Sequence, residues 1–351
     1  MSQFKYVSTT SGVMRDGLLS RSVVDAAPVR TRPSLVPVQP AGAVPAPTVA
    51  ILLCTYYGEQ FLADQLESFA VQTHRNWQAY ASDDASQDAT AAILMRYQEK
   101  WGVERFSLRQ GPGQGFAANF LSLTCDQSIK ADYYAYSDQD DIWEADKLQR
   151  ALAWLEGISP EIPALYCSRA LLVNEENQPI GNSPLFKRPP SFSNSLVQSI
   201  GGGNTMVFND ALRKLLMAAG SDVQIISHDC WAYMVAAGCG GKVFHDNYPS
   251  LRYRQHEHNI VGTNRSWRAR YTRFQRLYNG WLRSWNDHNI ASLRRLQDRL
   301  TPENRRILDD FSTARDAGLI LRLRLMKRTG IYRQSWLGDV AFFLAAILNK
   351  I

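Results

Sequence analysis

The 351 residues give room for one large domain with appendages or for two small domains. Hydrophobic residues make up 45% and charged residues 21% of the chain, which excludes a collagen, a disulfide scaffold and a wholly disordered chain. The net charge is +6, but it is distributed unevenly. Residues 265–351 hold 18 Lys and Arg against 7 Asp and Glu, a net charge of +11, so the remainder carries −5.

The cysteines and the apolar runs bear on the compartment. The five cysteines are scattered and form no C-x-x-C pair, which favours a reducing compartment. The N-terminus lacks the apolar stretch of a signal peptide, and no run reaches the ~18 to 20 apolar residues of a spanning helix. We therefore expect the protein in the cytosol or on the cytosolic face of a membrane.

Residues 1–47 are predicted to be a disordered leader. They show no apolar periodicity, and six prolines stand between Pro28 and Pro47. Order is expected to begin at Thr48, where the apolar run to Cys54 is typical of a buried strand.

From Thr48 onward, predicted strands and helices alternate. Strands are expected at 48–54, 77–81, 106–109 and 133–136, with helices at 59–72, at 89–100 and after the glycine-rich turn 111–115. This order predicts an α/β domain with a mainly parallel sheet and helices on both faces. Because ligands of such sheets bind outside the carboxyl ends of the strands, the polar clusters after Cys54, Ala81 and Tyr136 are expected to converge on one crevice.

The acidic run Asp138-Gln139-Asp140-Asp141 directly follows the strand 133–136. Two carboxylates at i and i+2 of a turn can face one divalent cation, with phosphate oxygens as its other ligands. Such an arrangement neutralises a diphosphate leaving group. The alternative is an acidic turn that caps a helix starting near Ile142.

A second acidic pair, Asp83-Asp84, follows the strand 77–81. A carboxylate there can accept a hydrogen bond from the N–H of a pyrimidine base. The alternative is an N-cap of the next helix, a role that suits Asp88 better than Asp83.

Two other patterns point to no chemistry. His256-Glu-His258 has no cysteine or third histidine at ligand spacing, so zinc is not expected. Gly111-Pro-Gly-Gln-Gly115 lacks the Gly-Lys-Ser/Thr end of a P-loop and is interpreted as a turn.

The run Gly201-Gly-Gly203 could let the backbone approach a sugar or acceptor, or be an ordinary turn.

Taken in order, these motifs resemble the family 2 glycosyltransferases with the GT-A fold, over roughly residues 48–264. The opening of that family is matched by Thr55–Glu59, Leu66–Ser68, Gln72–Thr73 and Ser82–Asp88. The metal-binding signature of its rhamnosyltransferase-like branch is matched by Ser137–Trp143, followed by Gly202–Met206, His228–Trp231 and Tyr253–His256. The ordered set is far more specific than any one of its members.

The resemblance implies a role for each matched residue. The donor would be bound by Thr55, Tyr57, Glu59, Asp83 and Asp138, and Mg²⁺ or Mn²⁺ by Asp138, Asp140 and His256. Asp229 would be the general base, with Gly203, Asn204, His228 and Trp231 on the acceptor side. Tyr57 stands where the family usually has Asn, which puts the nucleoside contacts there in question. By spacing, Asp229 could instead be an N-cap, with Trp231 in the core.

The resemblance therefore implies an inverting glycosyltransferase. The expected donor is dTDP-rhamnose, and the expected acceptor is a glycan or a lipid-linked glycan of surface polysaccharide synthesis. A UDP-hexose donor is the alternative within the class. A non-catalytic module that binds a nucleotide or nucleic acid is the alternative outside it, although paired strand-end carboxylates would repel a phosphate backbone.

The basic tail, residues 265–351, is predicted to be helical. Aromatic residues recur at helical spacing at Trp267, Tyr271, Phe274, Tyr278, Trp281 and Trp285. The apolar stretch from Trp336 to Leu348, at ~13 residues, is too short to span a bilayer but could lie in its interface. The alternatives are packing on the catalytic domain or a homodimer contact.

Overall fold

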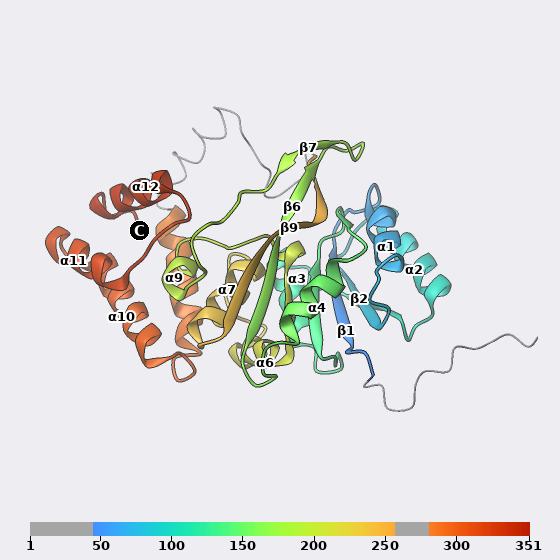
Figure 1. The fold of residues 1–351 in the computed structure, drawn as a ribbon, viewed down its shortest axis with the longest axis horizontal. Coiled ribbons are helices and arrows are strands. Elements are labelled where there is room, and N and C mark those ends of the chain that lie inside the picture. Colours follow the sequence, from blue (N-terminus) through green and yellow to red (C-terminus); the bar gives the residue numbers. More distant parts are fainter. Residues whose placement is uncertain (1–44, 257–280) are drawn as a thin grey trace, which may run out of the picture. The chain divides into compact units, whose positions relative to one another are not determined.

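The computed structural model describes residues 45–256 and 281–351 (Figure 1). The predicted leader up to residue 44 and the domain end at 257–264 lie outside the described residues. So do four residues of the aromatic stripe, namely Trp267, Tyr271, Phe274 and Tyr278. The described residues from Ala46 onward belong to one compact unit.

Strands and helices alternate through the first half of this unit. Its elements are β1 (Val49–Thr55), α1 (Leu62–Ala70), β2 (Trp77–Asp83), α2 (Thr90–Trp101), β3 (Phe106–Gln110), α3 (Phe116–Cys125) and β4 (Tyr133–Ser137). All seven residues of β1 are buried, as the continuous apolar run requires. The strands and helices predicted for this half are therefore confirmed, with ends that differ by a few residues.

A more irregular half follows. Its elements are β5 (Ile142–Trp143), α4 (Lys147–Leu155), β6 (Ala164–Val173), β7 (Pro179–Asn182), α5 (Phe192–Ser195), η1 (Gly203–Thr205), β8 (Val207–Asn209), α6 (Asp210–Ala219), α7 (His228–Gly238) and β9 (Lys242–Arg254). Among the described residues the strands form one sheet in the order β3-β2-β1-β4-β8-β6-β9-β5, with β7 paired to β6. The pairs from β3 to β4 and the pair β6–β9 are parallel, whereas β8 is antiparallel to both β4 and β6.

Helices cover both faces of the sheet. One buried cluster places Leu66 of α1, Leu94 of α2 and Leu148 of α4 against one face. The other cluster places Phe120 of α3 and Leu212 of α6 against the opposite face, together with helix α7, most of whose residues are buried. The α/β class with helices on both faces is therefore confirmed.

The helix predicted near Ile142 is wrong. Ile142 and Trp143 form β5, antiparallel to β9 with Trp143 opposite Leu251, and the helix begins at Lys147. Trp143 is buried, with its ring 4.7 Å from that of Phe69. The pairing partner lies more than a hundred residues away in the chain, so local spacing gave no signal of it.

The basic tail forms helices that share a core with the preceding domain. They are α9 (Trp281–Arg294), α10 (Pro302–Asp316), α11 (Leu319–Thr329) and α12 (Trp336–Ile347). Leu293, Leu308 and Phe311 are buried in the same cluster as Trp231 of α7, and Trp285 packs against it. Among the described helices, none has the length and apolar composition needed to cross a bilayer.

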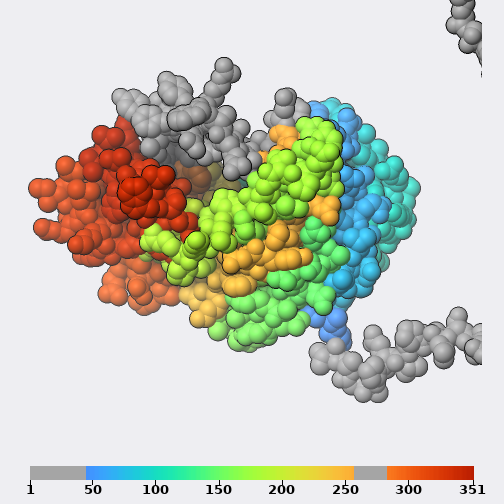
Figure 2. Space-filling model, turned by 45° about the horizontal axis from the view of Figure 1, so that its top comes forward, coloured from blue at the N-terminus to red at the C-terminus, as the bar shows by residue number. Residues whose placement is uncertain are grey.

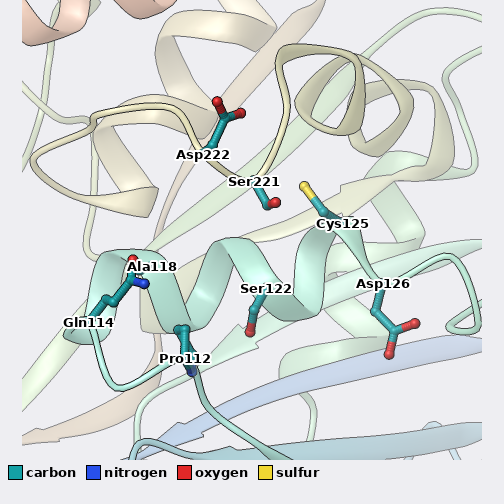
Figure 3. Close-up of a pocket in the computed structure, with 8 residues that line it drawn as sticks. All are labelled: Pro112, Gln114, Ala118, Ser122, Cys125, Asp126, Ser221 and Asp222. Carbon is teal, nitrogen blue, oxygen red and sulfur yellow. The ribbon is translucent and has the colours of Figure 1, made fainter.

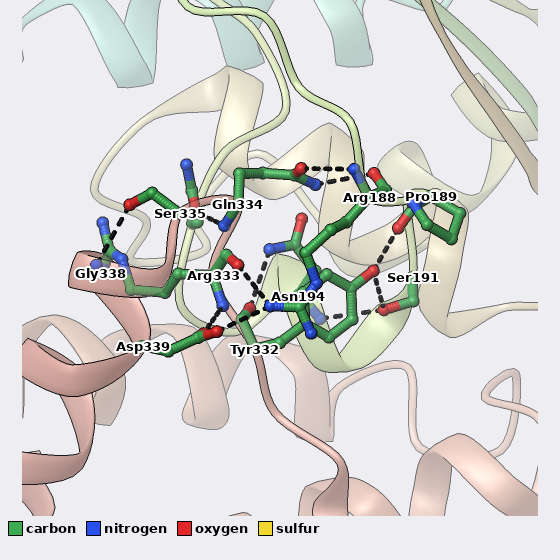
Figure 4. A network of polar contacts seen from close by, with 11 residues as sticks. Arg188, Pro189, Ser191, Asn194, Tyr332, Arg333, Gln334, Ser335, Gly338 and Asp339 are labelled. Carbon is green, nitrogen blue, oxygen red and sulfur yellow. Dashed lines mark hydrogen bonds and ion pairs between the residues drawn. The ribbon is translucent and has the colours of Figure 1, made fainter.

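A polar network also fastens the tail to the segment before α5 (Figure 4). Arg188 Nη1 donates to Asp339 Oδ2 over 2.7 Å and to the carbonyl oxygen of Arg333 over 2.8 Å. Asn194 Nδ2 donates to the carbonyl oxygen of Tyr332 over 2.9 Å. The C-terminal helices are thus held against the residues that lead into the turn at Gly202.

Candidate active site at the carboxyl ends of the parallel strands

The predicted polar clusters lie side by side because their strands are parallel neighbours. Thr55, the last residue of β1, is paired in register with Asp83, the last residue of β2. On the other side of β1, Leu53 is opposite Ser137, which ends β4 just before Asp138. The expected convergence at one edge of the sheet is confirmed.

Asp83 is held in a fixed orientation. Thr55 Oγ1 and Ser86 Oγ donate to its Oδ1 over 2.8 and 2.6 Å, and the Ser86 amide donates to its Oδ2 over 2.9 Å. A carboxylate oxygen can accept more than one hydrogen bond. Oδ2 therefore keeps capacity for a further donor, such as the N–H of a base.

Tyr57, the departure from the family pattern, has a left-handed backbone with φ of 51°. Asn adopts this region more readily than other non-glycine residues, which explains why Asn would suit the position. The Tyr57 amide donates to Ser86 Oγ over 2.9 Å, and its ring meets that of Tyr56 edge-on at 4.7 Å. Both rings are exposed at the end of β1.

Glu59, which precedes α1 in the chain, bonds to the residues just before α2. Its Oε2 accepts from the Ala89 amide over 2.9 Å, while its own amide donates to Asp88 Oδ2 over 3.2 Å. Asp88 Oδ1 in turn accepts from the Thr90 amide over 3.1 Å, but the N-cap of α2 is Ala89, so the N-cap alternative offered for Asp88 and Asp83 is wrong. The nucleoside contact implied for Glu59 stays a prediction.

Asp84 has a role that the sequence analysis missed. Its Oδ1 accepts from the Gly113 amide over 2.6 Å and its Oδ2 from the Gly115 amide over 2.9 Å. A Cβ at Gly111 would come within 2.7 Å of Asp84 Oδ1. The glycine-rich turn therefore holds the Asp84 carboxylate with its backbone amides, an arrangement that we call the carboxylate cradle, and it lies next to Asp83 at the edge of the sheet. The spacing of its glycines was a signal for it.

The acidic turn after β4 concentrates negative charge. Burial, followed by the charges of Asp140 and Asp229, raises the pKa of Asp138 to about 8. Burial and the charges of Asp140 and Asp138 also raise the pKa of Asp141. Asp141 is fully buried and accepts from Asn204 Nδ2 over 2.5 Å, so it ties the acidic turn to the turn at Gly203.

His256 lies beside Asp140, as its predicted role requires. The two are joined by a 2.8 Å contact between His256 Nε2 and Asp140 Oδ2. The end of β9 is fixed there by Arg254, whose Nε donates to the Asp140 carbonyl oxygen over 3.1 Å and whose Nη2 pairs with Asp64 Oδ2 over 2.8 Å.

The carboxylate oxygens of the acidic turn are suitable ligands for a divalent cation. Within the described residues, no three His, Cys, Asp or Glu side chains form a cage by themselves. Mg²⁺, however, is usually held by one or two carboxylates together with substrate phosphates, and Mn²⁺ also suits carboxylate oxygens. Asp138 and Asp140 supply such oxygens, and a bound cation would offset both the burial and the neighbouring charges that raise the pKa of Asp138.

Asp229 stands in the first turn of α7, where the helix dipole favours a carboxylate. The N-cap is Ser227, so the N-cap alternative for Asp229 is wrong. Ser199 Oγ donates to Asp229 Oδ2 over 3.3 Å. The negative charge of Asp229 acts on Asp138, which places it in the same electrostatic environment as the acidic turn.

Of the residues predicted on the acceptor side, two lie in a turn next to the acidic run and two are buried in α7. Gly203 and Asn204 form the turn η1 beside Asp141, and the Asn204 carbonyl oxygen accepts from Lys147 Nζ over 2.7 Å. His228 is buried and stacks on Phe120 at 3.7 Å. Trp231 is fully buried, so its contact with an acceptor stays a prediction.

Lys147 is another residue that the sequence analysis missed. It is fully buried, lies over the Trp143 ring at 4.6 Å, and burial lowers its pKa to about 7. The charges of Asp141 and Asp138 act in the opposite direction. Its bond to the Asn204 carbonyl oxygen fixes the turn next to the buried carboxylates.

A separate pocket of about 430 Å³ lies between α3 and the residues after α6 (Figure 3). Its lining includes Gln114, Cys125, Asp126 and Asp222 but none of the predicted site residues. Asp126 and Asp222 are paired with Arg109 and Arg295. Its carboxylates are thus already neutralised, and the pocket does not contribute to the carboxylate site.

Comparison with known proteins agrees with this arrangement. Residues 50–216 match the model of glycosyl transferase family 2. The part of the chain that presents the strand-end carboxylates thus matches a family 2 glycosyltransferase domain. The matched range holds the strands that present Asp83 and the acidic turn, and the mixed sheet with helices on both faces has the general arrangement that the resemblance implied.

Two relatives show how far the likeness extends. The dTDP-rhamnosyl transferase RfbG of Shigella flexneri is 29% identical over 247 residues, which cover 66% of this chain and 81% of RfbG. The putative glycosyltransferase EpsE of Bacillus subtilis is 32% identical over 110 residues, which cover 31% of this chain and 39% of EpsE. The likeness to EpsE thus spans less than half of either protein.

Solved structures align over more of the chain at lower identity. Staphylococcus aureus TarS 1-349 in complex with UDP-GlcNAc is 16% identical, with a TM-score of 0.49 over 86% of this chain and 81% of that one. The mannosyltransferase PcManGT of Pyrobaculum calidifontis, in complex with GDP-Man and Mn²⁺, is 15% identical, with a TM-score of 0.48 over 87% of each chain.

Proposed function

We propose that the family 2 domain is a metal-dependent, inverting glycosyltransferase that uses a nucleotide-diphosphate sugar. The observation that carries the proposal is that Asp138 and Asp140 follow β4 at the carboxyl ends of the parallel strands, and that the charges of Asp140 and of Asp229 on α7 both act on Asp138. One carboxylate group can then hold the diphosphate through a cation while another receives a proton. Neither role would explain all three carboxylates by itself.

In this proposal each residue has a separate task. Thr55 and Asp83 hold the nucleoside, with Asp83 oriented by its bonds to Thr55 and Ser86. Asp138 and Asp140, with His256 beside Asp140, hold Mg²⁺ or Mn²⁺. The bound cation would neutralise charge on the departing diphosphate.

Asp229 is proposed as the general base. It lies in the first turn of α7 and accepts the proton of the acceptor hydroxyl as the oxygen attacks the anomeric carbon. The attack and the departure of the diphosphate occur on opposite sides of that carbon, so the anomeric configuration inverts. No carboxylate nucleophile is needed.

We propose dTDP-rhamnose as the donor, because the likeness to RfbG spans most of both chains. A UDP-hexose is the second candidate. The acceptor is proposed to be a glycan or a lipid-linked glycan of surface polysaccharide synthesis, used at the cytoplasmic face of the membrane. Residues 48–264 are proposed as the catalytic domain, and the helices from 265 onward as its extension.

The experiment is a panel of nucleotide sugars with Mg²⁺ or Mn²⁺, scored by thermal stabilisation and by release of nucleoside diphosphate. A ligand that binds only the folded state raises the melting temperature with its affinity. We expect dTDP-rhamnose to stabilise the wild type only with metal. Asp138→Asn/Asp140→Asn should lose this effect, while Asp229→Asn should keep donor binding and lose transfer.

The matched control is Asp309→Asn, which removes a carboxylate that pairs with Arg294 in the C-terminal helices. It should behave as the wild type does. Stabilisation by a nucleotide without sugar release, in all variants including Asp229→Asn, would favour the binding-module alternative. If no nucleotide sugar shifts the wild type with either metal, the proposal is wrong.

A further inference from the structure

Helices α11 and α12 carry a cluster of exposed apolar side chains, which we call the apolar ridge. Trp336 and Leu337 at the start of α12 are 75% and 71% exposed, and Ile320 of α11 is 79% exposed. The ridge consists of Leu319, Ile320, Leu321, Trp336, Leu337, Val340, Leu344, Ile347 and Leu348. Soluble monomers seldom expose so many large apolar side chains together, and such surfaces mark protein or membrane contacts. Figure 2 shows α12, in dark red, at the surface of the molecule.

The ridge is the outer face of α12, continued by the start of α11. Phe342, Ala345 and Ala346 bury the inner face of α12. The ridge residues recur at steps of three and four on the other side. Arg322 Nη1 donates to the carbonyl oxygen of Ala346 over 3.0 Å, which fixes the start of α11 beside the end of α12. The start of α11 therefore lies next to the C-terminal end of α12.

The border of the ridge is basic. Arg324 and Lys327 are exposed on α11, and the described residues provide no acidic partner for either. The nearby carboxylates are already used, since Asp310 pairs with Arg328 and Asp339 pairs with Arg188. An apolar helix face with unpaired cations beside it is complementary to an anionic lipid surface.

We propose that the apolar ridge is a membrane-binding face that lies in the interface of an anionic bilayer. A helix of 12 residues is about 18 Å long, shorter than the hydrocarbon core, so α12 would lie along the surface and insert Trp336 and Leu337. A two-fold dimer across the ridge would bring the basic borders of two copies together, and the neighbouring carboxylates of Asp310 and Asp339 are already paired within each copy.

The test is co-sedimentation of the full chain with vesicles of phosphatidylcholine, with and without phosphatidylglycerol. We expect binding only to the anionic vesicles, at least ~10-fold weaker for Leu337→Glu/Leu344→Glu. Met95→Glu/Val103→Glu adds the same charge at exposed apolar positions on and after α2 and should bind as the wild type does.

Arg324→Ala/Lys327→Ala should weaken binding about fivefold per cation removed. Lys130→Ala/Lys187→Ala, which removes two exposed lysines elsewhere, should have a smaller effect. The proposal is overturned if the wild type does not bind anionic vesicles, or if the ridge variant binds as tightly as its control. It is also overturned if the ridge variant converts a dimer to a monomer, by light scattering, without changing vesicle binding.

An independent observation concerns Gln139, which lies between Asp138 and Asp140. Its Oε1 accepts from the Tyr56 amide over 2.7 Å, and its Nε2 donates to the Tyr56 carbonyl oxygen over 2.9 Å. A Cβ at Gly58 would lie 2.4 Å from Oε1, so glycine there leaves room for the side-chain amide. Gln139 thus pairs with the backbone of Tyr56 as a strand neighbour would.

We infer that Gln139 is a positioning residue that fixes the nucleoside loop to the acidic turn. This inference rests on the proposed function, because the loop carries Thr55 and Tyr57 and the turn carries Asp138. The two bonds set the spacing between the groups that hold the nucleoside and those that hold the diphosphate. A donor that spans both therefore meets a preformed site.

The test measures KM for the nucleotide sugar, kcat and the urea midpoint. For Gln139→Ala we expect KM to rise about tenfold, with a smaller change in kcat and a nearly unchanged midpoint. Gly58→Ala should raise KM similarly, because its Cβ displaces the amide. The double variant should be no worse than Gln139→Ala, since the amide that the Cβ meets is then absent.

Asp138→Asn separates the two possible failures. If it still binds the donor, the proposed function fails. If it loses the donor while Gln139→Ala keeps the wild-type KM, the positioning role of Gln139 is wrong and the proposed function stands. Additive effects of Gly58→Ala and Gln139→Ala would likewise overturn the positioning role.

Discussion

Gly203 lies where any side chain would collide with a buried imidazole. A Cβ built there would stand 2.0 Å from His228 Nε2, 2.8 Å from Cε1 and 3.0 Å from Cδ2. Ordinary van der Waals contact begins near 3.4 Å. Gly203→Ala therefore forces a separation of about 1.4 Å on two packed elements.

The imidazole has little room to move. His228 stacks on Phe120 at 3.7 Å and meets the Tyr136 ring edge-on at 4.7 Å. Overpacking of a rigid site costs about 1–3 kcal/mol, and we expect the upper part of that range here. Because Asn204 in the same turn bonds to Asp141, the displacement should also lower the rate of transfer.

Urea unfolding of a double-mutant cycle measures this cost. Gly203→Ala should lower the free energy of unfolding by about 2–3 kcal/mol in the wild type, but by less than about 1 kcal/mol in His228→Ala. Gly318→Ala is the matched control, because no atom lies within 4 Å of a Cβ there. If Gly203→Ala costs no more than Gly318→Ala, or costs the same without His228, the steric reasoning is refuted.

Three further predictions concern the same region. Burial lowers the pKa of His228 to about 4, so below pH ~6.5 the unfolded chain binds a proton that the folded protein does not. The free energy of unfolding should therefore fall by about 3 kcal/mol as the pH drops towards 4. His228→Gln should flatten this pH dependence, and an equal slope in both proteins would contradict the prediction. Asp84→Ala leaves the amides of Gly113 and Gly115 without their acceptor and should cost about 1–3 kcal/mol in urea unfolding; an unchanged midpoint would refute the cradle. Chelation with EDTA should abolish stabilisation by the nucleotide sugar and leave the melting temperature of the ligand-free protein unchanged; undiminished stabilisation would exclude a metal-bridged donor.

Local patterns determined the first half of the domain. The continuous apolar run at 49–55 and the helical spacing of Leu62, Leu66 and Phe69 are local signals, and both elements form where they were predicted. Strand–helix alternation in turn required parallel strands, and parallel strands place their polar ends at one edge. The meeting of Thr55, Asp83 and the acidic turn therefore followed from the sequence.

Contacts between distant residues decided the remainder. Trp143 lies in a strand because β9 pairs with it, and the Asp84 carboxylate is held because the turn at 113–115 comes within hydrogen-bonding distance of it. Gln139 and Lys147 bond to backbone groups 83 and 57 residues away, which no local period encodes. The sequence thus determined which groups reach the edge of the sheet. Only tertiary packing decided which of these groups bond to neighbouring segments and hold the site in place. The partner of a side chain depends on which distant segments fold against it.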